Sequence, residues 1–287
     1  MTAILKRELR TYFNSMIGYI FIGLFVLITA IYFSIYNLML LNSNFEVVLS
    51  SVTVIFLILV PVITMRLLSE EARQKTDQLL LTSPIKVIDI ILAKYFAAVI
   101  LFMIALFITS VFPFMLIFFG DVNFPQVFVT YLGFFFMGIC FIAVGIWISS
   151  LTDNQIVAAI GSFGILFLLF MVENIAVALP IGRNFSIIFI SILALAIIMY
   201  IYNLTKNLKV FLISILISCS IIGGIYFAKP EFYDGLAYKI VSSFAIVSKF
   251  SNFAIGILDL NAIIYYITFS MGFIYLTIKV VEKRRWN

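Results

Sequence analysis

Long apolar runs separated by short polar breaks dominate the pattern of this 287-residue chain. Eight runs are near the length of about 20 residues that an α-helix needs to cross a bilayer. They cover about residues 17–36, 47–68, 93–119, 127–150, 156–179, 185–204, 210–228 and 262–281. The pattern therefore predicts an all-α integral membrane protein, a polytopic bundle of eight transmembrane helices.

Residues 1–15 predict a shorter helix of a different kind. Its apolar residues share one helical face and its basic residues point elsewhere; the apolar ones are Leu5, Leu9, Tyr12 and Phe13. Such a helix lies on a membrane surface, so we expect an interfacial helix on the cytoplasmic side. The following apolar run is too long for a signal peptide and has no small-residue cleavage site, so we expect an uncleaved first span.

A charged segment, residues 66–94, separates the second and third apolar runs. Its nine charged residues are Arg66, Glu70, Glu71, Arg73, Lys75, Asp77, Lys86, Asp89 and Lys94. They cannot lie in hydrocarbon, so the segment is an aqueous connection. Spacing predicts helical pairs between Glu71 and Lys75 and between Arg73 and Asp77. Ser83 would cap a second helix with Pro84 at its first position.

Two interpretations of the charged segment stay open on this pattern. It is either a short amphipathic helix joined by Ser83-Pro84 to the third span, or a solvated loop with incidental charge pairs.

Residues 229–260 form a second stretch in which apolar and polar residues are mixed. Helical spacing there predicts one apolar face on the outer side; its members are Tyr233, Leu236, Ile240, Phe244 and Val247. This stretch is either a helix on or in the outer leaflet or a simple amphipathic connector.

Composition agrees with the membrane class. Hydrophobic residues make up 64% of the chain and charged residues 11%, against about a quarter charged in soluble proteins. The net charge is +5. Basic residues favour one side: fourteen lie in the segments that are cytoplasmic if the N-terminus is inside, and four lie outside. The positive-inside rule therefore places both termini in the cytoplasm.

Several kinds of chemistry are missing from the sequence. The chain has no histidine, and Cys140 and Cys219 both lie inside apolar runs. No GxxxxGK[ST] loop is present to cradle a nucleotide phosphate. An aspartyl protease would need two buried Asp residues facing each other, but Asp121 lies in a predicted turn and no predicted span carries a partner Asp. We therefore expect no catalytic, cofactor-binding or metal-ligating residue, and the chain is predicted not to be an enzyme.

Two features inside the spans are candidates for helix contacts and for function. Small residues at spacings of four mark the fourth and fifth runs, as in Gly145–Ser149 and Ala158–Ser162. They favour close helix packing, either within the chain or across a dimer seam. Glu173 is an acid well inside an apolar run, which makes it a candidate functional acid or a residue that reaches the outer interface.

The sequence EEARQKTDQLLLTSPI closely resembles the segment between the second and third spans of ABC-2 type transporter permeases, in the branch with the gliding-motility and NosY-like permeases. The matching residues are Glu70, Glu71, Arg73, Thr76, Leu79, Leu80, Ser83, Pro84 and Ile85. The family often has glycine where this chain has Lys75. The ending, from Ser251 through VEKRRW, is also similar, with Asp259 expected to cap the last span.

The resemblance implies a fold of six spans, so residues 185–228 would be an inserted transmembrane hairpin in a single permease domain, 1–287. It also implies re-entrant outer helices near 229–260. By resemblance, residues 66–94 form a cytoplasmic coupling region on which a separate ATPase subunit docks. The permease would export its substrate from a bacterial plasma membrane, with ATP and Mg in the partner chain.

The implied partners are the ATPase, a second identical or related permease, membrane lipid and an outer-side accessory protein, but no nucleic acid. The alternative function is a channel or membrane scaffold without an ATPase.

Overall fold

The computed structural model describes the chain except residues 77–84, 119, 229 and 287. Eight helices in this described part are long and apolar enough to cross a membrane, which confirms the predicted number of spans. They are Met16–Met39, Glu46–Gln74, Val87–Leu116, Phe124–Ser150, Gln155–Ala178, Arg183–Asn203, Leu208–Phe227 and Leu260–Arg284. The chain divides into two compact units: unit 1 is Met1–Leu168 with Ile246–Asn287, and unit 2 is Leu169–Ala245.

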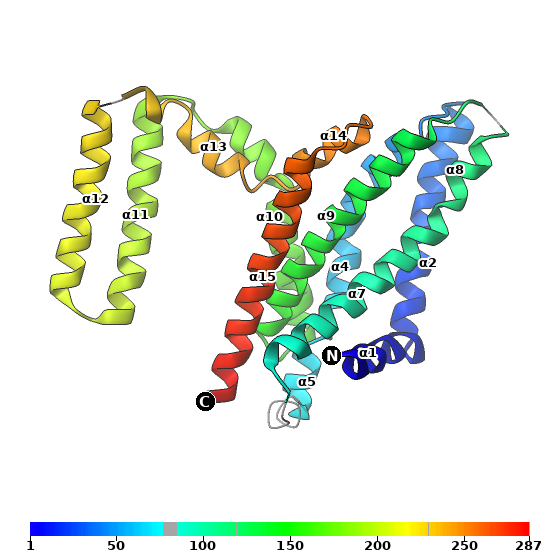
Figure 1. Ribbon diagram of the computed structural model, residues 1–287, viewed down its shortest axis with the longest axis horizontal. Coiled ribbons are helices and arrows are strands. Elements are labelled where there is room, and N and C mark those ends of the chain that lie inside the picture. Colours follow the sequence, from blue (N-terminus) through cyan, green and yellow to red (C-terminus); the bar gives the residue numbers. More distant parts are fainter. Residues whose placement is uncertain (77–84, 119, 229, 287) are drawn as a thin grey trace. The chain divides into compact units, whose positions relative to one another are not determined.

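The first part of unit 1 runs across the membrane and back. Its elements are α1 (Thr2–Asn14), α2 (Met16–Phe33), the π-helix η1 (Ser34–Met39), α3 (Glu46–Val52), the 3₁₀ turn η2 (Thr53–Ile55), α4 (Phe56–Thr64) and α5 (Ser69–Gln74). In Figure 1, α1 lies across the foot of α2. The chain therefore returns through α4 to place α5 at the α1 end of the unit.

The rest of unit 1 is organised around α9. The remaining elements are α7 (Val87–Thr109), α8 (Val111–Leu116), α9 (Phe124–Ser150), α10 (Gln155–Ala178), η4 (Ser248–Phe250), α14 (Ser251–Ala254) and α15 (Leu260–Trp286), with α10 continuing into unit 2. Helix α9 packs against α4, α7, α14 and α15. The ring of Phe56 lies 5.4 Å from that of Phe102 and 4.8 Å from that of Phe134, at the centre of this bundle.

Two glycines of α9 allow this close packing. A Cβ atom at Gly138 would overlap the ring of Phe102, and one at Gly145 would overlap the hydroxyl of Thr64. Replacing either glycine would therefore force α9 away from α7 or α4. Of the two interpretations of the small residues in this span, these contacts support packing within the chain.

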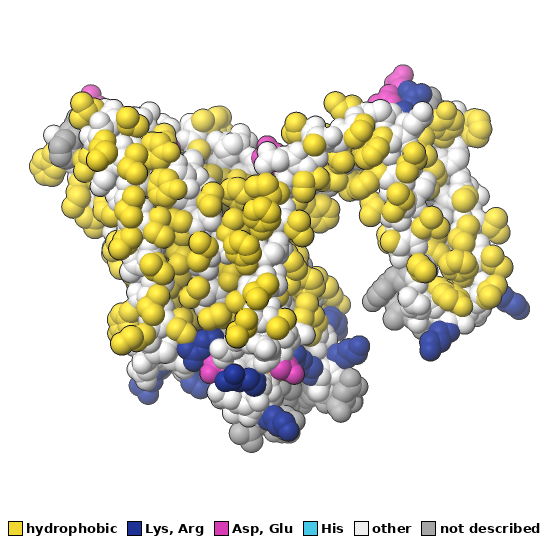
Figure 2. Space-filling model, turned by 180° about the vertical axis from the view of Figure 1, so that it is seen from behind, with side chains coloured by type: hydrophobic (Ala, Val, Ile, Leu, Met, Phe, Trp, Pro, Cys, Tyr) yellow, Lys and Arg dark blue, Asp and Glu magenta, His cyan; other side chains and the backbone are white. Residues whose placement is uncertain are grey.

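Charged groups gather at one end of unit 1. The N-terminus, α5 and the end of α15 lie at that end in Figure 1, and Figure 2 shows charged side chains below an apolar body. Arg284 of α15 pairs with Asp153 in the α9–α10 turn at 3.0 Å. The start of α1 and the end of α15 therefore lie at the same end of this unit, as an even number of crossings requires.

The N-terminus of α15 is capped as the sequence predicted. The Asp259 carboxylate accepts hydrogen bonds from the backbone N–H groups of Asn261 at 2.9 Å and Ala262 at 3.3 Å. The amide of Asn252 donates to the same carboxylate at 2.9 Å. This side-chain hydrogen bond and the two backbone bonds hold the pKa of Asp259 below its ordinary value.

Unit 2 contains a helical hairpin, α11 (Arg183–Thr205) and α12 (Leu208–Ala228), followed by η3 (Pro230–Tyr233) and α13 (Leu236–Ser242). Arg183 makes two hydrogen bonds to the Asp234 carboxylate, at 3.0 and 3.1 Å. Tyr233 donates to the backbone oxygen of Ile222 at 2.8 Å. These bonds attach the hairpin to the segment that follows it.

The prediction of one continuous apolar face over residues 233–247 is wrong. The stretch forms short helical segments, and its face changes between them: Tyr233 and Ala237 are buried, whereas Phe244 is 52% exposed. Gly235 interrupts the regular spacing because it adopts a positive φ of 68° and donates its backbone N–H to Ile181. Whether the stretch enters the outer leaflet stays a prediction.

Candidate functional site

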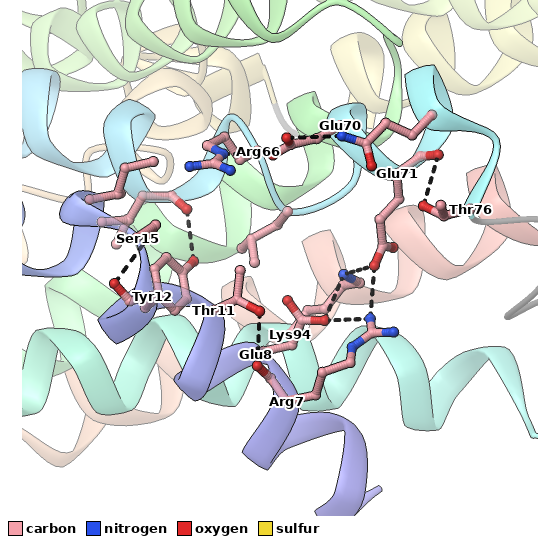
Figure 3. Close-up of a pocket in the computed structure, with 14 residues that line it drawn as sticks. Arg7, Glu8, Thr11, Tyr12, Ser15, Arg66, Glu70, Glu71, Thr76 and Lys94 are labelled. Carbon is pink, nitrogen blue, oxygen red and sulfur yellow. Dashed lines mark hydrogen bonds and ion pairs between the residues drawn. The ribbon is translucent and has the colours of Figure 1, made fainter.

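A charged cluster joins α1, α5 and α7 at the α1 end of unit 1. It consists of Arg7, Glu8, Glu71 and Lys94 (Figure 3). Lys94 is only 1% exposed, and its ammonium lies 3.2 Å from Glu8 and 2.8 Å from Glu71. Arg7 contacts the same two carboxylates at 2.7 and 2.9 Å. Two bases and two acids thus neutralise one another.

Lys94 can be buried only because both acids are present. An unpaired charge in a protein interior costs several kcal/mol, whereas a paired and hydrogen-bonded charge is tolerated. The hydrogen bond with Glu8 is also the largest influence on Arg7 and raises the pKa of its guanidinium. Arg7 therefore stays charged throughout the physiological range, and the cluster keeps its balance of charge.

Helix α1 packs against the rest of unit 1 through a face that differs from the predicted apolar face. Its buried residues are Ile4, Glu8 and Tyr12, spaced by four, whereas Leu5, Leu9 and Phe13 are partly exposed. Ile4 packs with Ile90 and Ala93 of α7. The protein-facing side of α1 thus includes an acid that meets Lys94. That α1 also lies on the membrane surface stays a prediction.

Tyr12 fastens α1 to the second span. Its hydroxyl donates to the backbone oxygen of Ile63 at 2.8 Å, inside the protein. Burial is the main reason why the pKa of Tyr12 is raised well above its ordinary value. The hydroxyl therefore remains a hydrogen-bond donor at any physiological pH.

The turn between α4 and α5 is held by Ser149 of α9. The Ser149 hydroxyl accepts from the backbone N–H groups of Leu68 at 3.3 Å and Ser69 at 3.2 Å, and it donates to the oxygen of Met65 at 3.2 Å. Within this connection Arg66 pairs with Glu70 at 2.6 Å. Helix α5 is therefore anchored to both α9 and the charged cluster.

The predicted docking residues divide into two groups. Glu70, Glu71, Arg73 and Thr76 lie in or next to α5, whereas Leu79, Leu80, Ser83 and Pro84 lie outside the described residues. Arg73 and Thr76 are exposed, and Glu70 and Glu71 turn towards the rest of unit 1. The described part of the segment therefore has an attached side and an exposed side.

Two details of this segment differ from the prediction. Glu71 pairs with Arg7 and Lys94 rather than with Lys75, because Lys75 ends α5 in the left-handed conformation, with φ 57°. Glycine suits such a position, which agrees with its frequency there in the resembled family. Helix α7 begins at Val87, after Lys86 in extended conformation, rather than at Pro84. The predicted cap by Ser83 and Pro84 lies outside the described residues. The predicted Arg73–Asp77 pair involves a residue outside the described part.

A pocket of about 330 Å³ lies beside the charged cluster. Residues of α1, of the stretch from Ile63 to Thr76 and Lys94 line it (Figure 3). Its walls carry opposite charges that already neutralise each other, and among the described residues no group of three or more His, Cys, Asp or Glu could hold a metal. The arrangement is suited to transmitting a movement of α5 to α1 and α7.

Sequence reasoning missed Arg7, Glu8, Tyr12 and Lys94 as site residues. Two residues in the sequence could have indicated this site. Glu8 is an acid among the basic residues of 1–15, and Lys94 is a base at the start of an apolar run, so each would need a partner of opposite charge. Glu173, the predicted functional acid, is exposed on α10 within unit 2, and its role stays a prediction.

Comparisons with known proteins match the region that contains α5. A family model described as ABC-2 family transporter protein matches residues 28–181, more than half of the chain. The match includes Glu71 and Lys94, begins after α1 and ends before the α11–α12 hairpin. Comparisons with curated proteins and with solved structures give no match. On the family match, the chain belongs to the ABC-2 family of transporter proteins and is a multi-pass membrane permease.

Proposed function

We propose that this permease is driven by a separate ATPase subunit that docks on α5 and the residues that follow it. The partner would bind ATP and Mg, and its closure would move α5. The observation that supports this proposal is the attachment of α5 to a buried charge. Glu71 holds Lys94 of the third span and Arg7 of α1 by ion pairs, so a movement of α5 reaches both helices.

The sides of α5 fit this role. Its exposed residues Arg73, Gln74 and Lys75 are accessible to a partner, whereas Glu71 faces inwards. The distribution of basic residues favours a cytoplasmic location for this end, where a soluble ATPase is found. Both termini of the chain would share that side.

Other parts of the proposal rest on family resemblance. The permease would act as a dimer, with itself or with a close relative, in a bacterial plasma membrane. It would export its substrate with an outer-side accessory protein, as a member of the branch with the gliding-motility and NosY-like permeases. The apolar spans carry few charged groups, which is compatible with an amphipathic or lipid-like substrate.

Co-purification of the tagged chain in mild detergent tests the proposal. We expect an ATPase with a P-loop to be recovered with the wild-type chain and to be lost with Arg73→Glu on the exposed side of α5. Leu80→Asp tests the predicted docking residues outside the described part in the same way. Lys209→Glu replaces an exposed base in the hairpin and is the matched control.

Glu71→Gln separates docking from coupling. Because Glu71 faces Lys94, we expect this variant to retain the ATPase but to lose the dependence of ATP hydrolysis on the permease. A wild-type chain that is recovered alone, with no ATPase activity, contradicts the proposal and leaves the channel or scaffold alternative.

A further inference from the structure

At the end of unit 1 opposite α1 and α5, two buried oxygen atoms lack hydrogen-bond partners among the described residues. They are Oδ1 of Asn37 in η1 and Oε2 of Glu46 at the start of α3. Asn37 is 3% exposed and Glu46 is 6% exposed, and η1 packs against α3. The amide nitrogen of Asn37 already donates to the backbone oxygen of Asn42 at 2.6 Å. Each side chain is therefore left with an unsatisfied acceptor.

The surroundings of Glu46 offer no opposite charge. Phe45, Val48 and Leu49 beside it are fully buried. The elements α2, η1, η2, α9 and α14 pack against α3 or adjoin it, and none carries a charged residue. Their other titratable groups are Tyr19, Tyr32, Tyr36, Tyr131 and Cys140.

The closest loops and turns do not change this conclusion. The turn containing Gly120 approaches Ser43, and its charged residue, Asp121, is exposed and is itself an acid. Lys249 of η4 acts electrostatically on Asp259. The backbone N–H of Glu46 bonds to its own carboxylate, but burial is the larger influence. An ionised Glu46 would therefore be a buried carboxylate without a counter-charge, which disfavours the charged form.

The chemistry of the two side chains identifies the ligand. Two acceptors cannot bond to each other, but a protonated carboxylic acid has an O–H donor. A metal cation would require several oxygen ligands, whereas a proton requires neither a cavity nor further groups. We propose that Glu46 is a proton-binding site: the proton neutralises the buried carboxylate, and the resulting O–H group is a donor available to an unsatisfied acceptor at the contact between η1 and α3.

Release of this proton has a structural consequence. It leaves a negative charge among apolar side chains, and this favours a state in which Glu46 reaches water. Separation of η1 from α3 would provide that access. Helix η1 is itself a π-helix, and the connection from it to α3 contains Leu41 at φ 50°; both are uncommon backbone conformations. Proton binding at Glu46 would thus keep this end of unit 1 closed.

Infrared spectroscopy of the full chain in lipid nanodiscs tests the proposal directly. We expect the C=O stretching band of a protonated carboxylic acid at pH 7, its loss in Glu46→Gln and its retention in Glu173→Gln, which changes an exposed acid. Glu46→Gln should fold, because its amide N–H group can replace the missing donor. Absence of the band in the wild-type chain, or its persistence in Glu46→Gln, overturns the proposal.

Thermal unfolding supplies a second test with a definite sign. If the folded state holds a proton that the unfolded state releases, the melting temperature falls as pH rises. This fall should be smaller in Glu46→Gln than in the wild-type chain. Replacing sodium and potassium by choline at constant pH should leave the wild-type melting temperature unchanged. Dependence on those metal ions, with no acid band, would overturn the proton assignment. Neither test involves an ATPase, so its outcome is independent of the proposed function.

Discussion

Lys94 and Glu46 are both buried in unit 1, at opposite ends of its helices, but their surroundings differ. Lys94 lies between two carboxylates, one from α1 and one from α5. Glu46 meets apolar side chains and leaves one oxygen without a partner. The first charge is satisfied by the protein itself, whereas the second requires a ligand, for which we propose a proton.

This difference separates a mechanical connection from a binding site. The partners of Lys94 come from two other elements, so removing any member leaves a buried charge unbalanced and makes α1, α5 and α7 interdependent. Glu46 connects to no charged residue on the elements packed against α3. Its state can therefore change without breaking an ion pair. Four predictions test this contrast, from the largest expected effect to the smallest.

Removing the buried cation should have the largest effect. Lys94→Met leaves Glu8 and Glu71 close together without their ammonium partner. We expect the free energy of unfolding to fall by about 3–5 kcal/mol, the usual result of breaking a buried ion pair. Thermal unfolding of the purified chain in nanodiscs measures the change.

Lys86→Met is the matched control, because Lys86 is an exposed lysine at the start of the same helix. We expect the double variant Glu8→Gln with Lys94→Met to lose less free energy of unfolding than the sum of the losses in the two single variants, because the two residues interact. Equal stability of Lys94→Met and the wild-type chain would contradict the role given to the charged cluster.

A neutral contact at the same end should have a smaller effect. Tyr12→Phe removes the hydroxyl and leaves the buried backbone oxygen of Ile63 without this donor. We expect a loss of about 1–3 kcal/mol in the free energy of unfolding. Tyr19→Phe changes an exposed tyrosine on α2 and should have little effect. Similar melting temperatures for the two variants would show that this hydrogen bond does not fasten α1.

The end of α5 can be stabilised rather than weakened. Lys75 has a left-handed backbone, which is unfavourable for residues with a Cβ atom. We expect Lys75→Gly to raise the free energy of unfolding by about 1 kcal/mol. Arg73→Gly, inside α5, should instead lower it by about 1 kcal/mol. A loss of stability in both variants would argue against the conformation of residue 75.

The partly exposed acid Asp259 should give the smallest effect and the opposite dependence on pH from Glu46. Hydrogen bonds from Asn252, Ala262 and Asn261 lower the pKa of Asp259 in the folded chain. The stability that this acid contributes is therefore present above its unfolded pKa of about 3.9 and is lost as pH falls through the lower folded value. Asp259→Asn should reduce the loss of melting temperature in this acidic range. If the melting temperature of Asp259→Asn depended on pH in the same way as that of the wild-type chain, Asp259 would not contribute to stability in this range.

The comparison also shows which features were local enough to predict. The eight spans follow from hydropathy, because a membrane helix needs a continuous apolar run whatever its neighbours are. The Asp259 cap follows from residues within four consecutive positions, because Asp259 accepts from the backbone N–H groups of Asn261 and Ala262. The two orphaned acceptors, by contrast, could not be recognised locally: Glu46 lies in sequence at the polar break before the second apolar run, and only packing buries it.

The sequence by itself therefore determined the membrane class, the number of spans and the position of the charged segment, since these depend on composition over short windows. Tertiary structure decided that Glu71 pairs with Arg7 and Lys94 rather than Lys75, and that α1 turns Glu8 inwards. These outcomes depend on residues up to 86 positions apart. A buried charge is governed by the groups that surround it in space, and the folding of distant helices brings those groups together.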